Sequence, residues 1–241
     1  FPGAAPRVAA LLGALAHRLD RRHRRVALEH VRAALPELDD EEARAVVRES
    51  FRNLAATLLQ SLAWSSADAE SYRRRFTVEG WEHLDAAEAE GRGAVLLTGH
   101  LGDGAAMAQL LAIERRPLAV LARPMDNPLL ERRVRGLRDR FGNRSIPKRG
   151  GARQMLRVLK RGGRLALTVD QRVHPNEGEA FDFFGRPAYT TPLPAQLSLR
   201  TGAPAVPFFG IPAADGRIRV RFHPPVPPRG VTLADLDARI R

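Results

Sequence analysis

Cysteine is absent from this chain of 241 residues, and its absence excludes several kinds of chemistry. Without thiols the chain can form no disulfide framework, no thiolate zinc site and no cysteine nucleophile. Hydrophobic residues make up 44% of the sequence and charged residues 27%, which is the balance of a globular protein and excludes wholesale disorder. Any chemistry must therefore rest on His, Ser, Asp, Glu, Arg or Lys.

Long apolar runs are also missing, and none approaches the roughly 20 residues that a membrane span needs. The longest candidate is Val8 to Ala16, which has Arg7 on one side and several basic residues beginning with His17 on the other. A short apolar helix with a basic flank suits either a membrane interface or docking on the body of the protein.

Lysine is scarce, since Lys148 and Lys160 are the only two, and arginine therefore carries nearly all of the formal net charge of +12. The charge is concentrated in residues 115–164, which hold 16 basic and 3 acidic residues. Guanidinium groups suit bidentate contacts with phosphate and carboxylate. The charge therefore favours a partner that carries such groups, which are found in nucleic acids, anionic membrane surfaces, phosphorylated small molecules and acidic proteins, although a bias in genome composition also favours arginine over lysine.

Missing motifs argue against two of the possible functions. Single-strand binding usually interleaves aromatic residues with arginine, but residues 115–164 contain only Phe141, and no helix-turn-helix or zinc spacing occurs. We therefore expect no nucleic-acid partner. The Gly-x-Ser-x-Gly elbow of a serine hydrolase is absent too.

The first third of the chain has a helical pattern. Leucine and valine recur at three- and four-residue spacing across residues 7–62, which predicts helix almost throughout. Pro36, followed by the acidic residues 39–42, predicts a break and a new helix start, because carboxylates complement the free amides of a helix N-terminus. We expect a helical, membrane-associating segment over residues 1–75, packed on one compact core over residues 76–241.

From Phe76 onward, short apolar runs alternate with helical patterns. Strands are predicted at 94–98, 118–122, 165–169 and 205–209, and helices at 104–114, 127–140, 150–161 and 192–201. The strand runs lack strict alternation, as expected of strands buried on both faces. A last, alternating strand at 217–222 looks like a sheet edge. The pattern predicts an α/β fold with a mixed, mostly parallel sheet flanked by helices.

Three strand ends direct attention to a candidate site, because ligands of open α/β sheets bind at the carboxyl ends of strands. These ends are followed by His100, Arg123 and Asp170, which we expect on a common rim. His100 is the best catalytic candidate, since a neutral imidazole can accept a proton near neutral pH. The amides of the helix that begins near Gly104 could bind a phosphate or stabilise an oxyanion.

An ordered set of motifs resembles one bacterial family. The set comprises Thr98–Asp103, Arg123 with Asn127–Pro128, Arg140–Gly142, Asp170–Gln171, Phe183–Gly185, Thr190–Thr191 and Thr201–Pro207. Each motif is short, but in this order they are similar to the late acyltransferases of lipid A biosynthesis, the lauroyl/myristoyl transferases. These enzymes are relatives of the phosphatidylinositol mannoside acyltransferases. The resemblance runs from about His23 to Pro227 and covers most of the chain.

The resemblance implies a glycerophosphate acyltransferase type of fold and a membrane-associated enzyme. Such an enzyme moves a fatty acyl chain from acyl carrier protein or acyl-CoA to a hydroxyl of an anionic glycolipid, of the lipid A precursor or the phosphatidylinositol mannoside type. We accordingly expect the cytoplasmic face of an inner membrane as its location, with the chain peripheral or anchored there, and neither a cofactor nor a metal.

The family signature is a histidine followed five residues later by an acid, and this sequence departs from it. In the family the histidine acts as general base on the acceptor hydroxyl and the acid orients it; here Ala105 stands where the acid is expected after His100. Three alternatives stay open. Asp103 folds back toward His100, another carboxylate such as Asp182 or Glu179 reaches in, or the chain is a catalytically attenuated protein that binds lipid.

The resemblance also marks residues for substrate binding. Arg123 and Arg140 match positions for an anionic head group, and Lys148 is a further candidate of the same kind. We expect Asp170 and Gln171 to order the loop that follows them rather than to take part in the chemistry. The remaining candidates are Gly99, Gly102, Asn127, Phe184, Gly185 and Thr191.

Two of these candidates also have a local structural interpretation. Thr191 precedes Pro192 and predicts a helix start capped by threonine. The Phe183–Gly185 segment predicts apolar surface and a turn, with its rings either in the core or along an acyl-chain groove.

Overall fold

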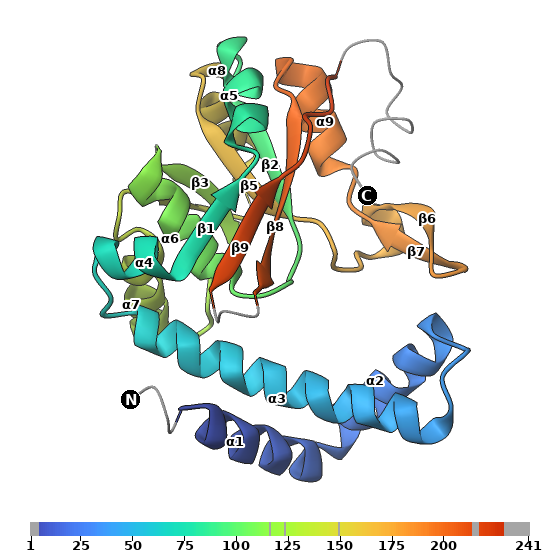
Figure 1. Ribbon diagram of the computed structural model, residues 1–241. Coiled ribbons are helices and arrows are strands. Elements are labelled where there is room, and N and C mark those ends of the chain that lie inside the picture. The colour runs from blue at the N-terminus through green and yellow to red at the C-terminus, as the bar shows by residue number, and fades with distance from the viewer. Residues whose placement is uncertain (1–4, 116, 123, 149, 214–216, 229–241) are drawn as a thin grey trace. The chain divides into compact units, whose positions relative to one another are not determined.

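The computed structural model describes residues 5–115, 117–122, 124–148, 150–213 and 217–228 (Figure 1). It divides into two compact units. The helical unit takes in the chain up to Ser66 together with Asp182–Pro187, and the α/β unit takes in the rest. Among the described residues, no helix is both long and apolar enough to cross a membrane.

The helical unit contains α1 (Ala5–Leu19), α2 (Arg21–Ala34) and α3 (Asp40–Trp64). Small residues let α1 and α3 approach closely: Ala9 is buried, and a Cβ placed on Gly13 would lie 2.6 Å from the Cα of Arg52. The helical pattern over residues 7–62 is therefore confirmed, but it is interrupted between α1 and α2 as well as at the predicted break. The reason is Asp20, whose side chain accepts a hydrogen bond from the backbone N of His23 and starts a new helix.

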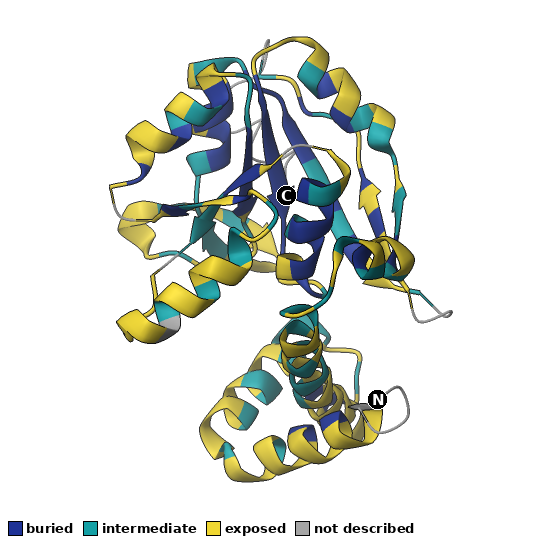
Figure 2. Ribbon diagram, turned by 90° about the vertical axis from the view of Figure 1, so that its left-hand side faces the viewer, coloured by how far each residue is buried: buried dark blue, intermediate teal, exposed yellow. Residues whose placement is uncertain are grey.

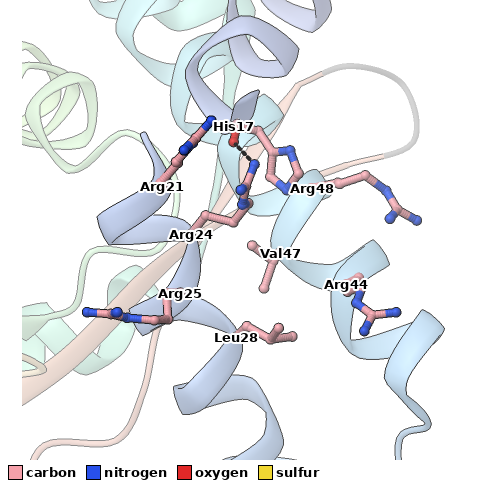
Figure 3. Close-up of a pocket in the computed structure, with 8 residues that line it drawn as sticks. All are labelled: His17, Arg21, Arg24, Arg25, Leu28, Arg44, Val47 and Arg48. Atoms are coloured by element: carbon pink, nitrogen blue, oxygen red, sulfur yellow. Dashed lines mark hydrogen bonds between the residues drawn. The ribbon is translucent and has the colours of Figure 1, made fainter. Parts of the chain in front are cut away.

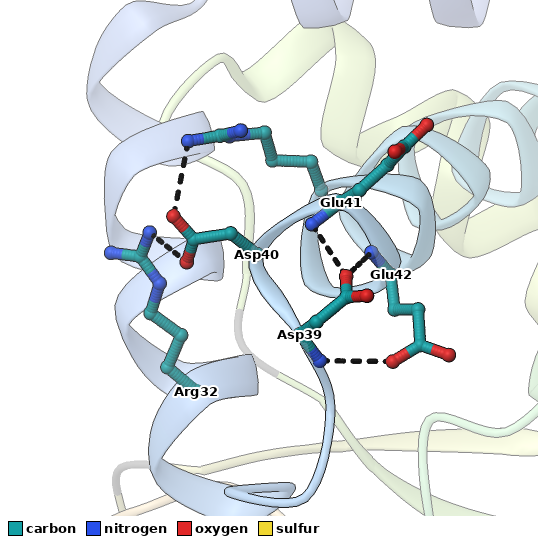
Figure 4. A network of polar contacts seen from close by, with 6 residues as sticks. Arg32, Asp39, Asp40, Glu41 and Glu42 are labelled. Carbon is teal, nitrogen blue, oxygen red and sulfur yellow. Dashed lines mark hydrogen bonds and ion pairs between the residues drawn. The ribbon is translucent and has the colours of Figure 1, made fainter.

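The predicted helix start after Pro36 is a capping box (Figure 4). The Asp39 carboxylate accepts hydrogen bonds from the backbone N of Glu41 and of Glu42, each at 2.8 Å, and the Glu42 carboxylate accepts one from the backbone N of Asp39. Arg32 of α2 also pairs with Asp40 at 2.6 Å. Free amides at the start of α3 are thus satisfied, and the turn between α2 and α3 is fixed.

The α/β unit is built on a seven-stranded mixed sheet in the order β1-β9-β8-β2-β5-β3-β4 (Figure 1). In chain order its strands are β1 (Phe76–Glu79), β2 (Ala94–Thr98), β3 (Leu118–Ala122), β4 (Arg144–Pro147), β5 (Arg164–Thr168), β8 (Ala205–Pro212) and β9 (Ile218–Phe222). Its helices are α4 (Ala69–Arg75), α5 (Trp81–Ala89), α6 (Gly104–Glu114), α7 (Pro128–Arg138), α8 (Ala152–Lys160) and α9 (Leu193–Thr201), with a short 3₁₀ turn at Pro175–Glu177.

The strands from β8 to β4 run parallel, while β9 pairs antiparallel with β8 and parallel with β1. The predicted α/β class with a mostly parallel sheet is therefore confirmed. All five residues of β2 are buried, as expected of a central strand between two layers of helices. Figure 2 shows the buried residues gathered on this sheet, whereas exposed residues cover most of α1, α2 and α3.

The prediction that residues 217–222 form an edge strand is wrong, because β9 lies between β8 and β1. The apolar side of β9 is buried at Ile218, Val220 and Phe222, as the alternation predicts. Its polar side is exposed, and there Glu79 of the neighbouring β1 pairs with Arg221 at 2.8 Å and with Arg219 at 3.2 Å. The strand β1 has only four residues and gave no apolar run that could predict it.

A small hairpin of β6 (Glu179–Phe183) and β7 (Arg186–Thr190) forms a separate two-stranded sheet. Its turn has positive φ at Phe184 and at Gly185, and the Asp182 carboxylate accepts a hydrogen bond from the backbone N of Gly185 at 3.2 Å. The predicted turn and apolar surface are confirmed. The rings of Phe183 and Phe184 are 63% and 57% exposed, so their packing in the core is ruled out.

Candidate active site

His100 and Asp170 meet at the carboxyl edge of the sheet. The strands β2 and β5 pair in parallel with Thr98 opposite Thr168, and each of the two side chains follows its strand by two residues. The His100 Nδ1 lies 2.8 Å from Asp170 Oδ1, and the backbone N of His100 donates to Asp170 Oδ2 at 2.6 Å. One carboxylate therefore holds both the backbone and the ring of the histidine.

The charge on Asp170 sets which ring nitrogen of His100 is free. Partial burial acts to raise the pKa of Asp170, but hydrogen bonds from the His100 backbone and ring outweigh it and leave that pKa below its ordinary value. An ionised carboxylate at Nδ1 favours the tautomer with the proton on Nδ1. The Nε2 atom is then left as a proton acceptor on a side chain that is 55% exposed.

Two glycines shape the loop that carries His100. A Cβ placed on Gly99 would lie 3.0 Å from Asp170 Oδ2, so glycine lets the carboxylate approach the backbone. Gly102 has a φ of +69°, and a Cβ there would lie 2.8 Å from the carbonyl oxygen of Gly210 in β8. The loop can therefore pass against the sheet only because both positions lack a side chain.

The carboxylate at the His100 ring is none of the three that the sequence suggested, Asp103, Asp182 and Glu179. Asp103 is 5% exposed, and its carboxylate accepts a hydrogen bond from the backbone N of Ala106 at 3.0 Å, so it caps α6. This cap also occupies one of the amides that we expected to be open to a phosphate or an oxyanion. Asp182 accepts from the amide of Gly185 in the hairpin turn. Asp170, expected only to order its loop, is the residue that contacts the ring.

Arg140 lies beside the capped end of α6, in a cluster that the sequence did not predict. Burial and the negative charge of Asp103 raise the pKa of the buried Tyr72, while the nearby charge of Arg140 acts in the opposite direction. The Arg140 guanidinium also lies 5.0 Å from the centre of the Phe141 ring, which in turn contacts the Tyr72 ring edge-on. Aromatic contacts thus position this cation. Tyr72 carried no motif, and only its burial reveals it.

The other predicted binding residues have local structural roles. Lys148 follows β4 and is exposed at the same edge of the sheet as His100, because β4 runs parallel to β3. The Asn127 side chain accepts a hydrogen bond from the backbone N of Leu129 at 2.9 Å and so caps the start of α7. Gln171 is exposed next to Asp170. Arg123 lies outside the described residues.

The predicted helix start is confirmed, but Pro192 is the N-cap residue of α9; the Thr191 hydroxyl, one residue earlier, accepts a hydrogen bond from the backbone N of Leu193 at 3.3 Å. Ala105, which stands where the family has an acid, lies exposed in the first turn of α6. In the described part of the chain, no group of three His, Asp or Glu side chains is placed to hold a metal ion.

Comparison with known proteins identifies the family. Residues 3–230 match the family described as bacterial lipid A biosynthesis acyltransferase. The chain belongs to this family. The resemblance seen in the ordered motifs is thereby confirmed, and membership of the lipid A acyltransferase family makes the chain an O-acyltransferase.

Three similar proteins show the range of this family. The lipid A biosynthesis acyltransferase 2 of Shigella flexneri is 26% identical over 97% of this chain and 74% of its own length. The lipid A biosynthesis myristoyltransferase of Escherichia coli (strain K12) is 25% identical over 91% of this chain and 68% of its own length. The phosphatidylinositol mannoside acyltransferase of Mycobacterium tuberculosis (strain ATCC 25618 / H37Rv) is 32% identical, over 54% of this chain and 42% of its own length.

Proposed function

We propose that the chain transfers a fatty acyl group from a thioester donor, acyl carrier protein or acyl-CoA, to a hydroxyl of an anionic glycolipid of the lipid A precursor type. The observation that carries this proposal is the contact between His100 and Asp170 at the carboxyl edge of the sheet. The names of the similar proteins from Shigella and Escherichia support the class of acceptor.

In the proposed reaction, Nε2 of His100 takes the proton from the acceptor hydroxyl as the oxygen attacks the thioester carbonyl carbon. A carbon–oxygen bond forms, and collapse of the tetrahedral intermediate breaks the carbon–sulfur bond. The protonated ring then gives its proton to the leaving thiolate. Asp170 keeps Nδ1 protonated and stabilises the imidazolium between these two transfers, in the way that the aspartate of a catalytic triad supports its histidine.

Asp170 thus takes the role of the acid that is missing at Ala105. The pairing with His100 speaks against the attenuated, lipid-binding alternative, because the histidine keeps a carboxylate partner on Nδ1 and an exposed Nε2. Asp170 supplies the same negative charge and the same contact with the histidine as the family's acid, but from a different position in the sequence.

The anionic head group of the acceptor would be bound by cations at the same edge of the sheet. Lys148 is exposed there, Arg140 is exposed with its charge acting on Tyr72 as that of Asp103 does, and guanidinium and ammonium groups suit phosphate. We retain Arg123 as a third binding residue from the sequence pattern. A phosphatidylinositol mannoside acceptor is the alternative, favoured by the similarity to the Mycobacterium tuberculosis enzyme, and it would offer the same phosphate chemistry.

The membrane partner is proposed from α1. Five large apolar side chains of this helix are exposed, and they are Val8, Leu11, Leu12, Leu15 and Leu19. Small residues of α1 face α3, so the leucines remain available for another apolar surface. Such a helix with a basic flank suits insertion into the interface of a lipid bilayer, and we propose a peripheral or anchored position on the cytoplasmic face of an inner membrane.

The test is acyl transfer by the purified chain. Labelled acyl carrier protein and acyl-CoA are each offered together with a lipid A precursor or a phosphatidylinositol mannoside, and the products are identified by mass spectrometry. We expect His100→Gln to lower kcat by about 10³-fold, within the range for loss of a general base, with an unchanged melting temperature. Acyl transfer by this variant at the wild-type rate would contradict the proposal.

A further inference from the structure

A cavity of about 580 Å³ lies within the helical unit and has no part in the site at His100. Figure 3 shows it from close by, with one wall from α2, another from α3, and His17 of α1 at one end. The residues that line it are His17, Arg21, Arg24, Arg25, Leu28, Arg44, Val47 and Arg48. Five of the eight are arginines, although apolar atoms make up most of the accessible lining of the cavity.

The positive charge around the cavity is only partly balanced. Arg44 pairs with Asp40 at 3.4 Å and Arg25 with Glu29 at 3.9 Å, both between largely exposed side chains. Across the described residues, Arg21, Arg24 and Arg48 have no carboxylate within ion-pairing distance. Gathering like charges in one cavity costs free energy unless an anion neutralises them.

One of these arginines is held in place. Arg24 is half-buried and donates a hydrogen bond to the backbone oxygen of His17 at 2.9 Å, and the His17 ring packs edge-on against Phe51. Burial, followed by the charges of Arg24 and Arg48, lowers the pKa of His17. The histidine therefore senses the same positive potential that the geometry of the arginines indicates.

Apolar side chains complete the lining. Val47 is buried in α3 and Leu28 is half-buried in α2, so the arginines surround a small apolar floor. This combination suits an amphipathic ligand that bears a charged group on an apolar or ring-shaped body. Guanidinium groups recognise phosphate by paired hydrogen bonds, and several of them together match its charge and its three oxygens.

We propose that this cavity is a second anion site, which binds a phosphate ester with Arg24 and Arg48 as its main contacts and Leu28 and Val47 beneath the attached group. The phosphate can come from a phospholipid head group at a membrane surface or from a soluble phosphate ester. The site does not depend on the transfer reaction, because no residue of it lies in the α/β unit.

The experiment compares two double variants of the full chain. Arg24→Gln with Arg48→Gln removes two guanidiniums of the cavity. Arg153→Gln with Arg157→Gln removes the same charge from exposed positions of α8, which do not line it. Both are measured by calorimetry with glycerol 3-phosphate and by sedimentation with vesicles of phosphatidylcholine containing phosphatidylglycerol. Vesicles with the same surface charge from a sulfonated lipid serve as the control for charge alone.

We expect the cavity variant to bind the phosphate probes about tenfold more weakly or worse, and the control variant to bind them like the wild type, because each charged hydrogen bond contributes on that scale. Binding of glycerol 3-phosphate supports a soluble source, and binding of vesicles alone supports a head group. Equal loss in both variants, equal binding of the sulfonated vesicles, or no binding of any probe by the wild type would overturn the proposal.

A measurement on the wild type guards against a variant that fails to fold. Saturating glycerol 3-phosphate, or a short-chain phosphatidylglycerol below its micelle concentration, should raise the pH at which the His17 ring titrates in an NMR spectrum, because the bound anion offsets the charges of Arg24 and Arg48. An unchanged His17 titration with both probes would contradict the site. Both readouts are of binding, so failure of the proposed acyl transfer leaves them intact.

Discussion

The two units of the molecule treat apolar residues and charge in opposite ways. The α/β unit buries its central strand β2 completely and pairs its site histidine with a carboxylate. The helical unit leaves the leucines of α1 exposed and surrounds a cavity with arginines. The first arrangement fixes reacting groups in place. The second leaves apolar and positively charged surfaces, which suit a binding partner with apolar and anionic groups.

The surroundings of two histidines show the same difference between the units. His100 lies against the carboxylate of Asp170, which stabilises a proton on its ring. Burial, followed by the nearby charges of Arg24 and Arg48, lowers the pKa of His17 and so disfavours the charged form of its ring. The histidine of the α/β unit is therefore placed to transfer a proton, whereas burial and positive charge favour the neutral ring of the histidine in the helical unit.

The largest effect is expected from Asp170→Asn, which removes the negative charge that distinguishes the surroundings of His100 from those of His17. The amide keeps the size of the side chain but removes the negative charge opposite Nδ1, so the tautomer with a free Nε2 loses its support. We expect kcat to fall by about 10²-fold or more, judged by the same change in catalytic triads. Steady-state acyl transfer measures it.

Asp103→Asn is the matched control for this prediction. Asparagine also caps helices, so α6 keeps its first hydrogen bond and the melting temperature should change little. We expect kcat close to that of the wild type. A loss in Asp103→Asn as large as in Asp170→Asn would show that Asp103 acts in the reaction after all.

A smaller effect is expected from Gly99→Ala. The new methyl group would lie 3.0 Å from Asp170 Oδ2 and 3.2 Å from its Cγ, so the carboxylate must shift away from His100. We expect kcat to fall about tenfold, because small displacements of reacting groups are costly. Gly104→Ala, where a Cβ meets nothing within 4 Å, should retain the wild-type kcat. Equal rates for the two variants would mean that the close approach at Gly99 is unimportant.

Leu11→Ser tests whether α1 of the helical unit binds a membrane. Leu11→Ser in α1 removes an exposed apolar side chain, so the free energy of unfolding should stay within about 0.5 kcal/mol of the wild type. Binding to phospholipid vesicles should weaken by about tenfold if the leucine is buried in the bilayer interface. Leu129→Ser in α7 is the control, since Leu129 is 71% exposed and Leu11 is 69% exposed. Equal vesicle binding by both variants would remove α1 from the interface.

Much of the fold can be predicted from the sequence, because short, continuous apolar runs are typical of strands that are buried on both faces. Strands β2, β3, β5 and β8 and helices α6, α7, α8 and α9 were predicted within a few residues. The four-residue strands β1 and β4 were not, because each is too short and too polar for a periodic signal. Which strand lies at an edge depends on the order of the strands in the sheet, and local sequence patterns do not predict this order.

The site was predicted in its parts but not in its pairing. The rule that ligands gather at strand ends brought His100 and Asp170 to one rim. Asp103, one of the partners that the sequence left open, accepts a hydrogen bond from the amide three residues after it and so caps α6. The adjacency of β2 and β5, with Thr98 opposite Thr168, is the fact that selects Asp170, and it comes from the tertiary structure.

The most direct test of the central claim is the protonation of the His100 ring, read by nitrogen NMR of histidine-labelled protein, with the His100 signals assigned by their loss in His100→Gln. In the neutral ring, we predict a proton on Nδ1 and a bare Nε2, with this preference lost in Asp170→Asn. A neutral ring with its proton on Nε2 in the wild type would contradict the account, because that nitrogen could then not accept a proton from an acceptor hydroxyl.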